Sequence, residues 1–422
     1  MFANAFFEKN KKYLNAFSRK PSLNLGIVVI IPCLNEPDVV TSLESLRKCE
    51  FPSCDIEVII AVNSSEAANE QVLLQNEKTI KEVSTWINKN ETDYLRFYLI
   101  HAPGLPKKDA GVGLARKIAM DAAVERFNYL NKPDGIICSF DADALCDKNY
   151  FNEIYTHFKQ NPKSPGASVF FEHPLNDDTI SETQKQGIIQ YELHLRYLRL
   201  AMQYAGLPYS FHTVGSSFCV RAGAYVKQGG MNKFQAGEDF YFLHKIIMLG
   251  NFSVINSTKV IPSPRVSDRV PFGTGAAMTK WINNDEKIYL TYCFEAFVAL
   301  KKLTDIVDSF YKCNTDEIIE KCNLLPSSLK EYLLKNEIEK AISNAEKNSS
   351  SLINFRKRFY VWFDAFRVIK YLNWSHENYF QKQAIVDACV LYLERVNAPL
   401  KFCNNEELLF HVREIDKKFY LK

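Results

Sequence analysis

The segment Gly135-Ile-Ile-Cys-Ser-Phe-Asp-Ala-Asp-Ala-Leu145 decides the fold. Its first six residues are apolar or small and follow the turn-forming pair Pro133-Asp134, which is typical of a short strand buried in a sheet. Asp141 and Asp143 come directly after this strand, where the backbone leaves the sheet. Two carboxylates so close together repel each other, and Mg²⁺ or Mn²⁺ would relieve that repulsion while also binding phosphate oxygens. A polar turn that only closes the strand is the alternative.

Strands and helices alternate before and after this segment. A continuous β-branched run predicts a buried strand at residues 25–31, and further strands are expected at residues 55–62 and 94–100. Helical spacing follows the first and second of them. A helix is expected over residues 114–130, directly before the strand that carries the two aspartates. The pattern predicts an α/β protein with a Rossmann-like, mostly parallel sheet flanked by helices, and its ligand crevice lies at the carboxyl ends of the strands.

Composition narrows the class of protein. The 422 residues are 47% apolar and 24% charged, as in an ordinary globular protein, and the net charge of +3 is too small to indicate nucleic acid as a partner. The eleven cysteines form no CxxC pair or zinc-ligand spacing, which favours a reducing compartment. No apolar run reaches the roughly 18 residues that span a bilayer. We expect a cytoplasmic protein.

The two ends of the chain differ from its middle. Residues 1–24 combine phenylalanines with lysines, so a helix there would be basic and amphipathic. Such a helix either contacts the inner face of a membrane peripherally or packs on its own protein. Residues 281–422 have helical spacing and are rich in Lys and Glu. We therefore predict an N-terminal segment (1–24), an α/β domain (25–280) and an α-helical C-terminal region (281–422).

Five stretches, in this order along the chain, resemble the family 2 glycosyltransferases of the GT-A fold. They are Ile31-Pro-Cys-Leu-Asn-Glu36, Lys108-Asp-Ala-Gly-Val-Gly-Leu-Ala-Arg116, Asp141-Ala-Asp143, Gly215-Ser-Ser-Phe-Cys-Val-Arg221 with Gly229-Gly230, and Gly237-Glu-Asp239. The resemblance covers about residues 25–277. No GxGxxG follows the first strand and no GxxxxGK[ST] occurs, which disfavours a dinucleotide dehydrogenase or a P-loop NTPase.

The resemblance implies a metal-dependent, inverting transferase. It would move a sugar from a UDP or GDP sugar to a glycan or a lipid-linked acceptor, and surface-polysaccharide synthesis is the usual setting of such relatives. Asp143, together with Asp141, would hold Mn²⁺ or Mg²⁺ and neutralise the leaving diphosphate. Asp239 would accept the proton of the acceptor hydroxyl, with Glu238 as the second candidate. Acidic residues that favour a helix N-terminus are the alternative explanation for Glu238-Asp239.

The resemblance also assigns residues to the donor and to the sugar. The residues expected at the donor nucleotide are Pro32, Asn35, Glu36, Asn63, Lys108, Gly113, Arg116 and Asp141. Arg265 and Arg269 join them from the loop of residues 264–275, which either covers the donor as a lid with its arginines on the phosphates or is a structural loop held by an Arg-Asp pair. Gly215 and Ser216 are expected at the transferred sugar or the acceptor. Many members of this family carry an aspartate that binds the base where this chain has Asn63, so the choice between UDP and GDP stays open.

Two other functions fit parts of the pattern. A catalytically silent relative that only binds a nucleotide or a partner need not retain Asp141, Asp143 and Asp239 together. A sugar nucleotidyltransferase usually opens with a Gly-rich signature after its first strand, which residues 32–36 do not resemble. The transferase is therefore the leading prediction.

Overall fold

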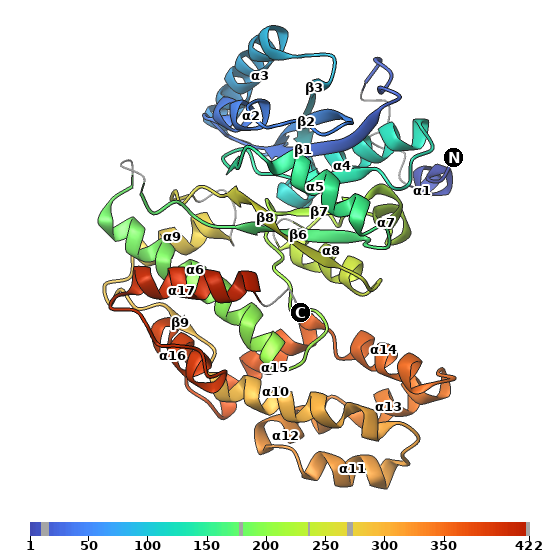
Figure 1. Cartoon of the computed structure of the whole chain (residues 1–422), viewed down its shortest axis with the longest axis vertical. Coiled ribbons are helices and arrows are strands. Elements are labelled where there is room, and N and C mark those ends of the chain that lie inside the picture. Colours follow the sequence, from blue (N-terminus) through green and yellow to red (C-terminus); the bar gives the residue numbers. More distant parts are fainter. Residues whose placement is uncertain (10–16, 177–179, 235–236, 268–272, 419–422) are drawn as a thin grey trace. The chain divides into compact units, whose positions relative to one another are not determined.

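The computed structural model describes residues 1–9, 17–176, 180–234, 237–267 and 273–418. The chain divides into two compact units. The first comprises Met1–Ile188 and Thr213–Lys280, and the second comprises Ile189–His212 and Trp281–Lys422. The first unit holds an eight-stranded sheet, and the second is almost entirely helical (Figure 1).

The sheet of the first unit is mostly parallel. Its strands, from one edge to the other, are β3 (Leu95–Leu105), β2 (Asp55–Ser65), β1 (Leu25–Cys33), β4 (Ile136–Ser139), β7 (Phe218–Arg221), β6 (Gly166–Phe171), β8 (Ser253–Ile261) and β5 (Leu145–Cys146). The pairs β3–β2, β2–β1, β1–β4 and β6–β8 are parallel, whereas β7 and β5 run antiparallel to their neighbours. This arrangement, with the helices around it and the helical C-terminal region, confirms the predicted fold class.

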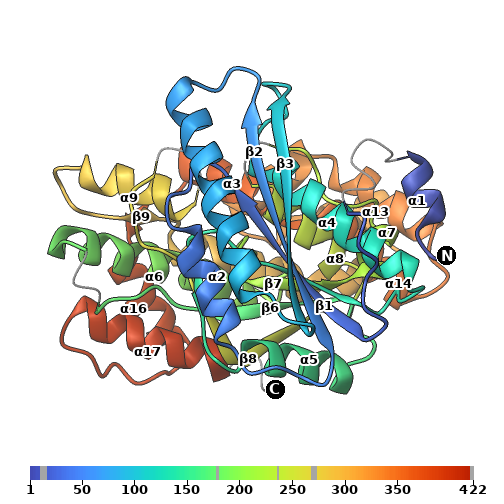
Figure 2. The same ribbon diagram turned by 90° about the horizontal axis from the view of Figure 1, so that it is seen from above.

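Helices cover both faces of the parallel half of the sheet (Figure 2). On one side lie α2 (Val39–Arg47) and α3 (Glu70–Asn90), whose apolar side chains join those of β1 and β2 in the main hydrophobic core. On the other side lies α4 (Val112–Tyr129), which is buried along most of its length. The remaining helices that begin in this unit are α1 (Asn4–Lys9), α5 (Tyr150–Gln160), α6 (Glu182–Tyr204), α7 (Ala222–Lys227), α8 (Glu238–Ile247) and α9 (Thr274–Ile282).

A buried ion pair fixes α4 on the sheet. Glu57 points from β2 toward α4, and Arg126 donates to its carboxylate from Nε at 2.7 Å and from Nη2 at 2.6 Å. The Arg126 guanidinium also donates to the hydroxyl of Tyr98 on β3 at 2.9 Å. A bidentate Arg–carboxylate pair has a fixed geometry, so it restricts the position of a helix more than apolar packing alone does. It therefore fixes the C-terminal end of α4 against β2 and β3.

The N-terminal helix packs on its own unit. Phe6 of α1 is buried, its ring lies 5.9 Å from that of Tyr225 in α7, and the ammonium of Lys117 lies 5.5 Å from it on another side. The sequence left two alternatives open for residues 1–24, contact with a membrane or packing on the protein itself. Helix α1 packs on the protein. Residues 10–16 of the predicted amphipathic segment lie outside the described residues.

The second unit is built from short helices. Besides most of α6 they are α10 (Phe294–Ile306), the 3₁₀ helix η2 (Val307–Phe310), α11 (Thr315–Asn323), α12 (Ser327–Lys335), α13 (Ile338–Lys347), α14 (Leu352–Trp362), α15 (Ala365–Asn378), α16 (Ile385–Arg395) and α17 (Asn405–Lys418). Two short strands, β9 (Leu290–Thr291) and β10 (Gln383–Ala384), pair antiparallel.

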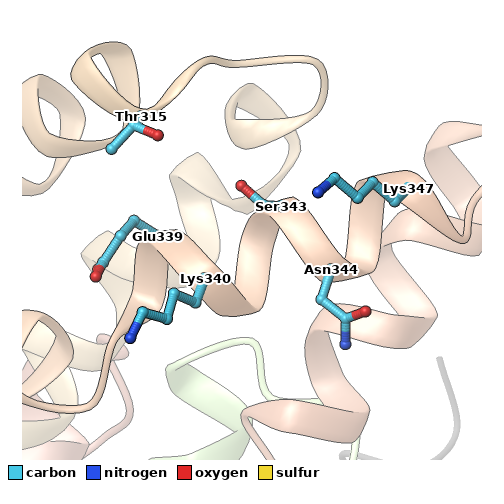
Figure 3. Close-up of a pocket in the computed structure, with 6 residues that line it drawn as sticks. All are labelled: Thr315, Glu339, Lys340, Ser343, Asn344 and Lys347. Carbon is cyan, nitrogen blue, oxygen red and sulfur yellow. The ribbon is translucent and has the colours of Figure 1, made fainter.

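A shallow polar groove of about 270 Å³ lies on this unit (Figure 3). It is lined by Thr315 at the start of α11 and by Glu339, Lys340, Ser343, Asn344 and Lys347 of α13. None of these six is a predicted site residue. All eleven cysteines are free thiols. Among the described residues, no helix combines the length and the apolar character needed to cross a membrane.

Candidate functional site

The predicted motifs meet at the carboxyl ends of β1, β2 and β4. β1 pairs with β2 on one side and with β4 on the other. The connection from β1 to β2 therefore runs in one direction across the sheet, and the connection from β3 to β4 runs in the opposite direction. The crevice beyond such a point is where ligands bind in open α/β sheets. Asn35 and Glu36 follow β1, Asn63 lies near the end of β2, and Asp141 follows β4. The site therefore begins as an edge lined with polar and acidic groups.

The guanidinium of Arg116 joins three of the five motifs. Arg116 lies in the second turn of α4 and is buried. Its Nε donates to Ser139 Oγ at 3.0 Å, its Nη2 donates to Asp141 Oδ1 at 2.9 Å, and its Nη1 pairs with Glu238 of α8. One cation thus holds the end of β4, the turn after it and the start of α8 at fixed separations.

Two glycines make this convergence possible. A Cβ on Gly113 would lie 2.2 Å from the carbonyl oxygen of Phe234, and one on Gly215 would lie 2.9 Å from Arg116 Nη2 and 3.0 Å from Asp239 Oδ2. Real side chains do not approach this closely, so larger residues would push α4 and the Gly215 segment away from α8. The Gly215 motif therefore lies against the Glu238-Asp239 motif, as the order of the motifs had suggested.

Asp239 has an unusual environment. It lies in the first turn of α8, and its Oδ1 accepts a hydrogen bond from the amide of Phe240 at 2.7 Å. Burial and then the negative charge of Glu238 raise the pKa of Asp239 to about 7, although the cation of Arg116 opposes them. Its side chain still keeps some contact with solvent, whereas Glu238 is buried. Asp239 can therefore exchange a proton near neutral pH.

Arg265 connects the second aspartate to the loop after β1. Its Nη2 lies 2.8 Å from Asp143 Oδ2, and its Nη1 donates to Glu36 Oε1 at 2.8 Å. Residues 229 positions apart in the sequence are thereby brought together. The Glu36 carbonyl oxygen in turn accepts from Thr79 Oγ1 of α3 at 2.8 Å. Arg269, which was predicted with Arg265, lies outside the described residues.

The carboxylates of Asp141 and Asp143 are suitable ligands for a divalent cation whose remaining ligands come from a bound substrate. The Asp141 and Asp143 side chains are 38% and 24% exposed, so each reaches the crevice despite its arginine partner. Within the described ranges, no three His, Cys, Asp or Glu residues gather as a metal cluster. Mg²⁺ is commonly held by one or two carboxylates plus substrate phosphates, and this oxygen-only pair meets that requirement.

Asn76 of α3 is a site residue that the sequence reasoning missed. Its Oδ1 accepts from the backbone amide of Asn35 at 2.9 Å, and its Nδ2 donates to the carbonyl oxygen of Asn63 at 2.9 Å. It thus joins the ends of β1 and β2. Asn63 is itself buried, and its Nδ2 has no hydrogen-bond partner among the described residues. No sequence signal distinguishes Asn76, because one asparagine in a polar helix resembles its exposed neighbours.

Three predicted residues stand apart from this cluster. Pro32 was expected to end the first strand, but it is buried within β1 and pairs with Ala61 of β2, so the strand continues to Cys33. Lys108 is exposed on the loop before α4 and forms no ion pair within the described part of the chain. The Ser216 hydroxyl is buried and lies 3.3 Å from that of Ser217. These positions give no direct support for ligand contacts.

Comparison with known proteins gives little further guidance. No protein-family model and no curated protein matches the chain. Among solved structures, S. aureus TarS 1-349 matches with 13% identity and a TM-score of 0.39, over 94% of this chain and 91% of that one. The same protein with UDP-GlcNAc matches with 14% identity and a TM-score of 0.40, over 94% and 89%.

A third match comes from an archaeal source. The mannosyltransferase PcManGT of Pyrobaculum calidifontis, in complex with GDP-Man and Mn²⁺, has 11% identity and a TM-score of 0.36, over 99% of this chain and 93% of that one. With identities and TM-scores this low, none of these matches supports a conclusion about the function of this chain.

Proposed function

We propose that this protein is a metal-dependent, inverting glycosyltransferase that transfers a sugar from a nucleoside-diphosphate sugar to a hydroxyl of a glycan or lipid-linked acceptor. The convergence of Arg116, Asp141, Glu238 and Asp239 beside Gly215 is the observation that carries this proposal. The motifs resembled family 2 glycosyltransferases in order and spacing, and their members from β4, α4 and α8 occupy one point of the crevice.

The two neighbouring acids have different environments, and this difference favours Asp239 as the base. Glu238 is buried and its charge is paired with that of Arg116, and this ion pair stabilises the contact between α4 and α8. Asp239 has a pKa raised to about 7 by burial and by Glu238, and it retains contact with solvent. A base works best when its pKa lies near the operating pH and the proton to be removed can reach it. We therefore assign the base to Asp239 and a positioning role to Glu238.

The charge of the site favours a cation together with the donor. Among the described residues, the carboxyl groups of Glu36, Asp141, Asp143, Glu238 and Asp239 face two guanidiniums, those of Arg116 and Arg265. The balance is therefore negative, and a diphosphate would add further negative charge. Mn²⁺ or Mg²⁺ bound by Asp143 and Asp141 would offset that charge and stabilise the leaving diphosphate.

The reaction is a single displacement at the anomeric carbon. The acceptor hydroxyl oxygen forms the new C–O bond while the bond to the diphosphate breaks, and the hydroxyl proton passes to Asp239. The electron pair of the broken bond leaves on the diphosphate oxygen. Because the hydroxyl attacks from the face opposite the diphosphate, the anomeric configuration inverts. Asn63, near the end of β2, would bind the nucleotide, and Asn76 of α3 would hold Asn63 in place by donating to its carbonyl oxygen.

Thermal unfolding with nucleotides tests this proposal. A ligand present at 100 times its Kd stabilises the folded state by about 2.7 kcal/mol. We expect the wild-type Tm to rise with UDP or GDP only when Mn²⁺ is present, and the Asp143→Ala variant to lose that rise. Asp93→Ala removes an exposed carboxylate before β3 and should respond like the wild type. If no nucleotide raises the Tm, the transferase is wrong and a silent, partner-binding relative becomes the better assignment.

A further inference from the structure

Helix α14 of the second unit exposes an apolar and basic surface. Its buried face carries Phe355, Phe359 and Tyr360. On the opposite face, Ile353 and Val361 are 67% and 65% exposed, which is high for β-branched aliphatic residues. They are eight positions apart, so they lie on the same side of the helix.

Cations lie between and beside these aliphatic residues. Lys357 is four positions from both Ile353 and Val361 and therefore lies between them, and Arg358 is its exposed neighbour. The sequence of α14 contains no acidic residue. Its third cation, Arg356, is neutralised by Asp308 at 2.8 Å. The exposed face therefore has a positive charge that no acid on the helix balances.

A similar apolar and basic pair is exposed on the next helix, α15. Phe366 is 37% exposed, and the ammonium of Lys370, one turn later, lies 4.6 Å from the centre of its ring. The acid between the two helices, Asp364, is engaged in capping α15, where it accepts from the amide of Arg367 at 2.8 Å. We call four exposed residues of α14 the α14 surface: Ile353, Lys357, Arg358 and Val361.

We propose that the α14 surface docks the second unit on an anionic lipid bilayer. Aliphatic side chains that lie among lysines and arginines match the boundary of such a bilayer, where the apolar groups enter the acyl region and the cations stay at the phosphates. The phosphates of a nucleic acid would pair with the cations, but Ile353 and Val361 would remain exposed to water. The charge complementarity therefore favours lipid headgroups, each cation contributing about 1 kcal/mol.

This assignment differs from the membrane contact suggested by the N-terminal sequence. There, Phe6 of α1 is buried against Tyr225 and is not available to lipid. The α14 surface combines the two required features, exposed apolar groups and cations, on residues that are exposed. The inference does not depend on the proposed transferase activity.

Sedimentation of the full chain with lipid vesicles tests the proposal. We expect the protein to sediment with vesicles that contain phosphatidylglycerol in phosphatidylcholine, to do so less as salt is raised, and to stay in solution with phosphatidylcholine alone. The double variant Lys357→Gln, Arg358→Gln should bind roughly 30-fold more weakly, as expected from two lost cations. The double variant Ile353→Ser, Val361→Ser should bind at least about tenfold more weakly.

A matched control separates the surface from net charge. Lys302→Gln with Lys335→Gln removes two cations from exposed positions on α10 and α12 of the same unit and should leave binding within about threefold. The proposal is overturned if anionic vesicles do not sediment the wild type, if this control loses as much binding as the α14 variants, or if the serine variant binds like the wild type. Circular dichroism of each variant checks its fold, and nucleotide binding measured separately keeps the two proposals distinct.

Discussion

Each unit of this protein buries a cluster of ionised side chains, and the two clusters have opposite charge ratios. In the first unit, one guanidinium, that of Arg116, faces the three carboxyl groups of Asp141, Glu238 and Asp239. In the second unit, the described network sets three arginines and a histidine against two carboxylates. Its members are Arg196, Arg199, Arg413, His212, Glu192 and Asp416.

The contacts of the second cluster are extensive. Arg413 donates to both oxygens of Glu192, at 2.7 and 2.8 Å, and Arg196 donates to Glu192 at 2.8 Å. Arg199 Nε lies 2.7 Å from Asp416 Oδ1, and His212 Nε2 lies 2.9 Å from its Oδ2. These bonds tie α6 and the segment after it to α17. We interpret this network as structural, because its bonds join helices and its side chains are buried.

The pKa shifts follow from the charge ratios. Burial works to raise the pKa of both Asp239 and Asp416. At Asp416, His212 and the arginines overcome it and hold the pKa well below its usual range. At Asp239, Glu238 adds to the effect of burial and Arg116 only partly opposes it, so the pKa rises to about 7. Burial of ionised groups alone thus does not set the direction of the pKa shift; the ratio of carboxylates to cations around the group decides it.

The largest expected effect tests this difference at Asp239. Asp239→Asn should lower kcat with a nucleotide-sugar donor by about 10³-fold, because the acceptor proton would have no base. Its stability should not fall at pH 8. The raised pKa of Asp239 means that its contribution to stability is present at acid pH and lost as the pH rises through about 7. Steady-state kinetics and thermal unfolding measure the two effects.

The control for this prediction is Asp134→Asn, which removes an exposed carboxylate in the turn before β4 and should leave kcat nearly unchanged. An Asp239→Asn variant that retains more than a tenth of wild-type kcat would show that another group accepts the proton.

The second prediction concerns Asp416, whose pKa shifts in the opposite direction to that of Asp239. Asp416→Asn should lower the free energy of unfolding of the second unit by about 3–5 kcal/mol, because it leaves three buried arginines facing the single carboxylate of Glu192. The lowered pKa of Asp416 means that this difference is present at neutral pH and is lost only at strongly acidic pH. Three of the four tryptophans, Trp281, Trp362 and Trp374, belong to the second unit, so tryptophan fluorescence in denaturant follows it.

Asp387→Asn, at an exposed position in the first turn of α16, serves as the control and should change stability by no more than about 0.5 kcal/mol. Equal destabilisation by the two variants would contradict the structural role of the network.

The sequence predicted the architecture where local patterns are strong. The apolar runs at residues 25–31 and 55–62 became β1 and β2, and the helix expected over residues 114–130 became α4. The antiparallel direction of β7 was not predicted. Only four residues long, β7 has too few positions to show a periodicity, and its direction is set by pairing with β4 and β6.

The candidate site was predicted as a list of residues and not as an arrangement. Motif spacing identified Arg116, Glu36 and Arg265, but their partners depend on contacts between distant segments. Sequence spacing cannot show that Arg265 reaches Glu36 across 229 positions, or that Asn76 connects the ends of β1 and β2. The same holds for the second cluster, whose residues belong to no motif and come from both ends of the second unit.

The smallest expected effect is a shift in a pH profile. If Asp239 is the base, kcat/KM should fall about tenfold per pH unit below its pKa of about 7, since only the ionised carboxylate accepts a proton. Because Glu238 is a cause of the raised pKa, Glu238→Gln should move the midpoint of the profile about one unit toward acid. The rate itself can also drop, because Arg116 loses a partner, so the midpoint is the informative quantity. A midpoint that stays in place or moves toward alkaline pH contradicts the proposed coupling, and an inactive Glu238→Gln with an active Asp239→Asn would exchange the roles of the two acids.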